Sequence, residues 1–136
     1  MEPIDLLLPG GLLHAALLTV VICWAGRTGE RSTLIGIRLW STDSSTAAWQ
    51  AGHRAALGWA RAMLGVAAVS FAVGLALLEG VDDLPGSASV WHAVGTVAAF
   101  LACGALMVRR ADQAAKQTLL AEYEETGEVP GARAGT

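Results

Sequence analysis

The fold is decided by three long apolar stretches, of which the first reads LLLPGGLLHAALLTVVICWAG over Leu6–Gly26. The second reads AALGWARAMLGVAAVSFAVGLALL over residues 55–78, and the third reads SVWHAVGTVAAFLACGALMV over residues 89–108. A helix of about 20 mostly apolar residues crosses the ~30 Å hydrocarbon core of a bilayer, and each stretch reaches that length. The sequence therefore predicts an all-α integral membrane protein with three transmembrane helices.

The composition agrees with this class. Of the 136 residues, 54% are apolar and 15% are charged, whereas a soluble domain has about 45–50% apolar and ~25% charged residues. The mean hydropathy is +0.49, and the net charge of −3 leaves no overall basic character for nucleic-acid binding. We therefore expect the lipid bilayer as a partner and no nucleic acid.

The distribution of charge predicts the orientation in the membrane. The N-terminus, MEPID, lacks the basic start of a signal peptide, so we expect the first stretch to be retained. Eight of the nine basic residues lie in residues 27–54 or 109–136: Arg27, Arg31, Arg38, Arg54, Arg109, Arg110, Lys116 and Arg133. Since basic segments stay in the cytoplasm, we expect a multi-pass protein of the cytoplasmic (inner) membrane, with the N-terminus outside and the C-terminus inside. Glu79, Asp82 and Asp83 would then form an acidic outer surface.

This orientation divides the chain into a membrane domain (residues 1–108) with a cytoplasmic loop (residues 27–54), followed by a cytoplasmic tail (residues 109–136). The tail composition favours a helix to about residue 125, which Gly127 and Pro130 would end, with a loose segment after it. Within that helix Ala111, Ala115, Leu119 and Tyr123 recur at helical spacing. This stripe would pack on the loop, pack on another subunit or remain solvated.

The loop at residues 27–54, RTGERSTLIGIRLWSTDSSTAAWQAGHR, is much longer than a minimal helix connection. Ser41, Thr42 or Asp43 is suited to cap a helix that continues without a break into the second stretch. Trp49, His53 and Arg54 would then lie in the first turns of that helix.

Two polar residues lie inside the apolar stretches. His14 is near the middle of the first, and Arg61 follows Arg54 by seven residues, so that both arginines share a helix face. Two interpretations stay open for each: His14 is a hydrogen-bonded packing residue or a ligand, and Arg61 reaches back to the headgroups or acts within the bundle.

Small residues and cysteines favour plain packing roles. Gly58-xxx-Ala62 and Gly95-xxx-Ala99 place small residues one turn apart, which suits packing of the three helices or a contact between copies in a homo-oligomer. Cys23 and Cys103 are read as small buried side chains. No HExxH, nucleophile elbow, P-loop or GxGxxG occurs, so we expect neither an enzyme nor a cofactor or metal site.

The loop resembles the SdpI-like family of bacterial membrane proteins. The resemblance rests on Ile35-Gly36-Ile37-Arg38, then Ser45, Trp49 and His53-Arg54, in the order of the family's Gly-x-Arg, Ser/Thr-rich spacer, Trp and Asn/His-Arg pair. It extends over about residues 30–105. The chain departs from the pattern at Leu39-Trp40-Ser41, where a Thr-Pro type turn is common.

The resemblance implies immunity to a secreted antimicrobial peptide, together with signalling through a cytoplasmic regulator held at the membrane. A cationic peptide toxin would meet the acidic outer side, and Arg38, Trp49, His53 and Arg54 would offer a docking surface inside. Lipid anchoring by these residues stays an open interpretation, with Arg38 holding a phosphate and Trp49 fixed at the interface. So does a different class of protein, a small accessory subunit that packs on other membrane subunits.

Overall fold

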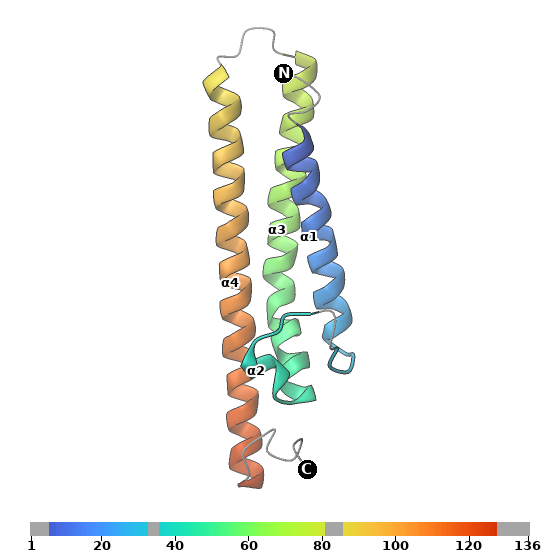
Figure 1. Ribbon diagram of the computed structural model, residues 1–136, viewed down its shortest axis with the longest axis vertical. Coiled ribbons are helices and arrows are strands. Elements are labelled where there is room, and N and C mark those ends of the chain that lie inside the picture. Colours follow the sequence, from blue (N-terminus) through green and yellow to red (C-terminus); the bar gives the residue numbers. More distant parts are fainter. Residues whose placement is uncertain (1–5, 33–35, 81–85, 128–136) are drawn as a thin grey trace. The chain divides into compact units, whose positions relative to one another are not determined.

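The computed structural model describes residues 6–32, 36–80 and 86–127, and within these ranges it contains helices and no strand (Figure 1). The helices are α1 (Leu7–Gly26), α2 (Trp40–Asp43), α3 (Thr46–Gly80) and α4 (Gly86–Thr126). Three of them, α1, α3 and α4, are long and apolar enough to cross a membrane. The predicted all-α class with three such helices is confirmed.

The start of α3 differs from the expectation. The Oγ of Ser45 accepts the backbone N–H of Ala48 at 3.1 Å, so Ser45 caps this helix. The prediction of a cap at Ser41, Thr42 or Asp43 is wrong, because the segment Trp40–Asp43 forms a separate short helix. As expected, α3 then runs unbroken into the second apolar stretch.

The helix α4 ends at a glycine cap. The helix reaches Thr126, close to the predicted end at about residue 125. Gly127 has a φ of +66°, and its N–H donates to the Tyr123 carbonyl at 2.8 Å. This is the left-handed cap that glycine adopts without a side-chain penalty. The expected loose segment beyond it lies outside the described residues.

The chain forms two compact units, and both α3 and α4 contribute to each of them. Unit 1 comprises Met1–Val20 and Trp59–Ala105, and unit 2 comprises Val21–Gly58 and Leu106–Thr136. Unit 1 holds most of the apolar stretches. Unit 2 holds the motif-bearing loop and the tail.

Small residues let the helices of unit 1 approach each other. A Cβ built at Gly10 of α1 would lie 3.7 Å from the Phe71 ring of α3, and one at Gly74 would lie 3.0 Å from Leu6. Buried small and flexible side chains complete the packing: Ala16, Ala60, Met63 and Ala67. Close backbone approach through small residues is the usual way in which helices associate in lipid.

The two Gly-xxx-Ala pairs do not contribute to this packing. Gly58, Ala62, Gly95 and Ala99 are exposed, and a Cβ added at Gly58 or Gly95 meets no heavy atom within 4 Å. The expectation that these pairs pack the three helices together is therefore wrong. A contact between copies of the chain stays a prediction.

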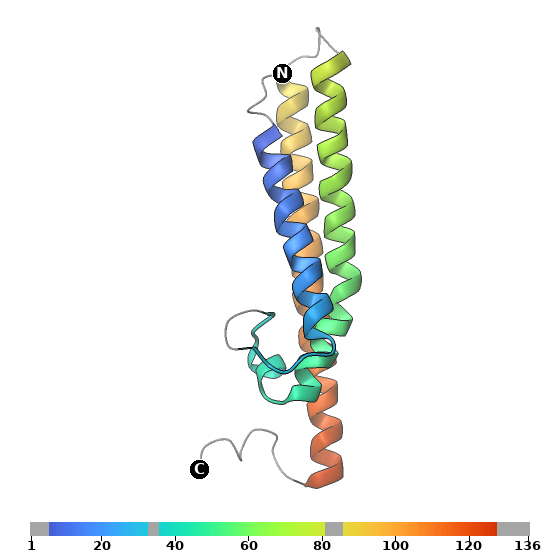
Figure 2. The same cartoon turned by 90° about the vertical axis from the view of Figure 1, so that its right-hand side faces the viewer.

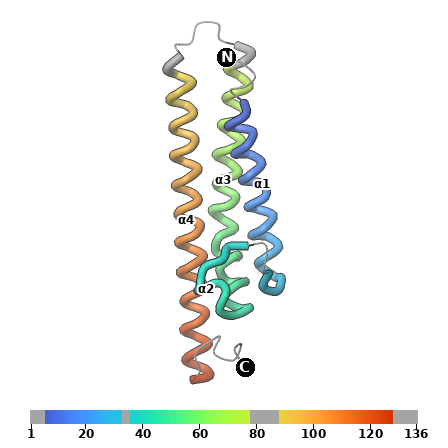
Figure 3. The backbone as a smooth tube through the Cα atoms, in the orientation of Figure 1, coloured from blue at the N-terminus to red at the C-terminus, as the bar shows by residue number. Residues whose placement is uncertain are grey.

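Unit 2 is built around the start of α3. Figure 2 shows α2 beside the first turns of α3, and the tube in Figure 3 shows the same arrangement. The buried residues of this unit come from α1, the loop, α3 and the tail, and include Cys23, Ser41, Thr42, Trp49, His53 and Ala115. The loop is thus part of a folded core.

Candidate functional site

Three residues of the family-like motif meet in one buried cluster of unit 2. Trp49 is 1% exposed and His53 is 0% exposed, and their ring centroids lie 4.3 Å apart. Gly36 has a φ of +140°, and a Cβ there would overlap the Trp49 ring and lie 3.1 Å from Nε2 of His53. Glycine meets both demands, because it lacks a side chain and tolerates a positive φ.

His53 joins the segment after Gly36 to α3 through both ring nitrogens. The backbone N–H of Ile37 donates to Nε2 at 3.1 Å, and Nδ1 lies 2.8 Å from the Trp49 carbonyl oxygen. Since a carbonyl only accepts, Nδ1 carries the hydrogen and Nε2 is the acceptor. Neither nitrogen is left to ligate a metal or to accept a proton from a substrate in this conformation.

We expect 15N NMR of histidine-labelled protein in micelles to show this arrangement. His53 should give the neutral Nδ1–H tautomer at neutral pH, with the shift of Nε2 typical of an acceptor nitrogen. The His53→Gln variant assigns the signal. An Nε2–H tautomer for His53 would contradict the described hydrogen bond to Ile37.

Two further glycines allow the surrounding segments to approach α3. A Cβ at Gly26, the last residue of α1, would overlap the His53 ring. A Cβ at Gly52 would lie 2.7 Å from Cγ2 of Thr42 and 3.3 Å from the Ala111 carbonyl oxygen of α4. The side of α3 that carries Gly52 and His53 is therefore covered by α1, by α2 and by the tail helix.

Thr42 organises the turn that carries Arg38. Its hydroxyl donates to the Ile37 carbonyl at 2.7 Å and accepts the Leu39 N–H at 2.9 Å. Thr42 is 0% exposed, so these bonds satisfy a buried hydroxyl. The turn holds Arg38 at the surface next to the buried cluster.

The tail helix packs on this module. Ala48 of α3 forms a buried apolar cluster with Ala115 and Leu119 of α4. The hydroxyls of Ser41 and Ser45 donate to Asp112 at 2.7 Å and to Glu122 at 3.0 Å. Of the predicted stripe, Ala111, Ala115 and Leu119 are buried, whereas Tyr123 is 49% exposed. Packing on the loop is thus the alternative that the structure supports.

Asp112 is one of the charged groups at this junction, together with Glu122 and Lys116. Its Oδ2 also accepts a hydrogen bond from Lys116 at 2.7 Å. The hydrogen bonds from Lys116 and then from Ser41 lower the pKa of Asp112, which extends the range of the ionised carboxylate to lower pH. An ionised carboxylate is the better acceptor for the buried Ser41 hydroxyl.

The two motif arginines lie at the surface of unit 2. Arg38 pairs with Asp43 at 3.0 Å, and their side chains are 49% and 40% exposed. Arg54 is exposed, and its Nε donates to the Gln50 carbonyl at 3.3 Å. Both guanidinium groups are exposed cations, a chemistry that suits contact with a phosphate or a carboxylate.

The expected four-residue docking surface is therefore reduced to its two arginines. Trp49 and His53 are buried, with Gly36 and Gly26 close to their rings, so they cannot contact a partner or the lipid interface from this position. The indole N–H of Trp49 has no acceptor within the described part of the chain. Its position is set by shape, through Gly36 and the His53 ring.

The remaining predicted residues lie away from this cluster. His14 is exposed in unit 1, and its Nδ1 lies 2.9 Å from the Gly10 carbonyl of its own helix. Arg61 is also exposed. Asp82 and Asp83 lie outside the described residues, and Glu79 is described only as part of the α3 backbone, so the acidic surface stays a prediction.

Sequence reasoning missed several residues that build the module. Gly26 and Gly52 are required for close approach, and Ser41 and Asp112 form a bond between residues 71 positions apart. No local pattern signals such a pair. Gly52 directly precedes His53 and Gly26 lies ten residues before Gly36, but glycines are too common in this chain for this spacing to single them out.

No protein-family model, curated protein or solved structure matches the chain. Among the described residues, no group of three His, Cys, Asp or Glu side chains is placed to hold a metal ion. What the site offers chemically is a rigid support that presents two guanidinium groups. This arrangement suits binding of an anionic group.

Proposed function

We propose that the chain is a non-enzymatic bacterial membrane protein of the immunity and signalling type, resembling the SdpI-like family. Unit 2 is its cytoplasmic recognition module, and Arg38 and Arg54 contact a cytoplasmic regulator there. The observation that carries the proposal is the packing of Gly36, Trp49 and His53 into one core. A simple connector has no need of such a core, whereas a binding surface needs rigid support.

The opposite side of the membrane is the proposed site of the peptide toxin. The segments at the ends of the apolar stretches there carry Glu79, Asp82 and Asp83 and no basic residue. A cationic peptide would be attracted over roughly a Debye length of 8–10 Å. This proposal requires the N-terminus outside and unit 2 in the cytoplasm.

Cysteine labelling tests this orientation. In a background without Cys23 and Cys103, a cysteine at exposed Ala47 of unit 2 should resist a membrane-impermeant maleimide in intact cells, and one at Ser87 should react. Permeabilised cells should label at both positions. Labelling of Ala47→Cys alone in intact cells would reverse the orientation and overturn the proposal.

Growth protection tests the function itself. A deletion strain should be inhibited by medium conditioned by its parent strain, and a plasmid copy of the gene should restore growth. The Arg38→Ala copy should reach the same membrane level and fail to restore it. Equal growth of the deletion strain and the parent in conditioned medium would contradict an immunity role.

A second function, a small accessory subunit, is favoured by the exposed Gly-xxx-Ala pairs. Gly58, Ala62, Gly95 and Ala99 are exposed, as they would be if another helix packed on them. Burial of the tail stripe in the chain's own unit 2 favours the autonomous protein. Purification in native lipid separates the two, since an accessory subunit should carry other membrane proteins in stoichiometric amounts.

A further inference from the structure

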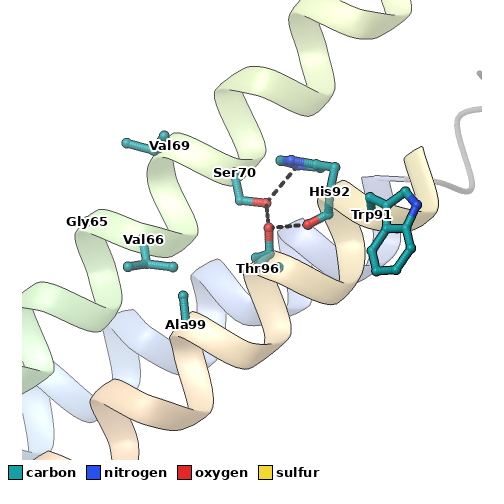
Figure 4. Close-up of a pocket in the computed structure, with 9 residues that line it drawn as sticks. Gly65, Val66, Val69, Ser70, Trp91, His92, Thr96 and Ala99 are labelled. Atoms are coloured by element: carbon teal, nitrogen blue, oxygen red, sulfur yellow. Dashed lines mark hydrogen bonds between the residues drawn. The ribbon is translucent and has the colours of Figure 1, made fainter. Parts of the chain in front are cut away.

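Within unit 1, polar side chains of the pocket between α3 and α4 are partnered by one another (Figure 4). The Oγ of Ser70 lies 3.1 Å from Nε2 of His92 and 2.9 Å from Oγ1 of Thr96. Hydrogen bonds between neighbouring helices are a normal part of packing in lipid. The end of α1 in unit 2 differs, because it carries a cation without a polar partner.

That cation is Arg27, the residue directly after α1. Its guanidinium carbon lies 5.2 Å from the centroid of the Trp24 ring, and its N–H continues the last turn by donating to the Cys23 carbonyl at 3.2 Å. Nε of Arg27 is buried without an acceptor, and within the described residues its terminal nitrogens make no hydrogen bond. A guanidinium held over an indole face by cation–π attraction keeps its outer N–H groups available for an anion.

Trp24 sets this cation at the edge of the apolar surface of α1. Its side chain is 56% exposed, and that of Val21, one turn earlier, is 53% exposed. In a bilayer, acyl chains cover an exposed valine, and an indole ring lies at the level of the headgroups. An apolar, an aromatic and a cationic side chain thus follow one another at successive turns, which is the order of acyl chain, interface and phosphate across a leaflet.

The same level of unit 2 is rich in positive charge. A Cβ at Gly26 would overlap the His53 ring, and one at Gly52 would lie 3.3 Å from the Ala111 carbonyl oxygen, so α1, α3 and α4 meet there. Residues 21–29, 50–58 and 106–111 at this level contain no Asp or Glu and four arginines, which are Arg27, Arg54, Arg109 and Arg110. A zwitterionic headgroup balances its phosphate with its own cation, so an anionic headgroup complements this level better.

We propose that Arg27 and Trp24 form a binding seat for one anionic phospholipid, whose phosphate accepts hydrogen bonds from the Arg27 guanidinium and whose acyl chain lies along Trp24 and Val21. Phosphatidylglycerol is a simple lipid of this class. The seat depends neither on a regulator nor on which end of the protein faces the cytoplasm. One such cation at a membrane surface should favour phosphatidylglycerol over phosphatidylcholine about fivefold.

The test uses the full chain, labelled with 5-fluorotryptophan, in dodecylmaltoside micelles. The probes are phosphatidylglycerol and phosphatidylcholine with identical acyl chains, and the 19F signal absent from Trp24→Phe assigns Trp24. Phosphatidylglycerol should shift this signal saturably, with half-saturation at an about fivefold lower mole fraction than phosphatidylcholine. Equal half-saturation for the two lipids, or no saturable shift with phosphatidylglycerol, would overturn the proposal.

Matched arginine variants separate a seat from general surface charge. Arg27→Gln should abolish the preference for phosphatidylglycerol, while an unchanged 19F signal of buried Trp49 shows that unit 2 is still folded. Arg110→Gln is the control, because Arg110 is an exposed arginine at the same level, and it should leave most of the preference. If Arg110→Gln lowers the preference as much as Arg27→Gln does, only the total charge matters and the proposal fails.

A soluble anion separates a lipid from a free phosphate. Inorganic phosphate shares the charge of the headgroup but has no acyl chain to lie along Trp24. At millimolar concentration it should neither shift the Trp24 signal nor displace phosphatidylglycerol. A saturable shift with inorganic phosphate alone would assign the seat to a soluble anion and contradict the proposal.

Discussion

Replacing Gly36 by alanine is expected to destabilise unit 2 by about 3–5 kcal/mol, near the upper end of single-residue effects. Two causes act together. The φ of +140° is strained for any L side chain, and the added Cβ would overlap the Trp49 ring. Trp49 is 1% exposed and in contact with the tilted His53 ring, with 4.3 Å between the ring centroids, so it has little room to move.

The sharpest measurement is hydrogen exchange at the Ile37 amide. This N–H is held by Nε2 of His53, so its protection reports closure of the segment on α3. Gly36→Ala should abolish the protection. Gly58→Ala is the matched control in the same unit, since an added Cβ there meets nothing within 4 Å, and it should gain up to about 1 kcal/mol as a helical alanine. Unchanged Ile37 protection in Gly36→Ala would show that the Trp49 contact is not structural.

The long helices were predictable because their signal is local. Each apolar stretch reaches the length that a bilayer requires, and α1 begins at Leu7 and ends at Gly26, beside the boundaries expected from composition. The signal that ends α4 is equally local, because Gly127 caps the helix through its own left-handed conformation. Such features depend on neighbours within one or two turns.

The core of unit 2 could not be predicted in this way. Trp49 and His53 stand at the start of an amphipathic helix, and the sequence does not say that the preceding loop returns to cover them. Gly36, which lies against both rings, is 13 positions before Trp49 and 17 before His53. The bond from Ser41 to Asp112 in the same unit joins residues 71 positions apart. The motif named Gly36, Trp49 and His53 together, but it did not indicate that their side chains pack against one another or that they are buried.

This division of the motif predicts two different ways of losing function. Trp49→Ala removes a large side chain that is 1% exposed, and we expect a loss of about 3–5 kcal/mol in the stability of unit 2. Arg38→Ala removes one partner of an exposed ion pair, which should cost at most about 1 kcal/mol. Under the proposed function both variants should fail to protect a deletion strain in conditioned medium.

The stability measurement then separates the roles. Unfolding in a detergent titration, followed by circular dichroism, should be shifted strongly for Trp49→Ala and hardly for Arg38→Ala. Lys116→Ala is the control, since it also removes one exposed cation from an ion pair in unit 2 but lies outside the motif, and it should protect fully. If Arg38→Ala also protects fully while Trp49→Ala does not, Arg38 is no recognition residue and unit 2 matters only as a folded support. If Trp49→Ala protects as well, the buried cluster is dispensable and the proposed recognition module is wrong.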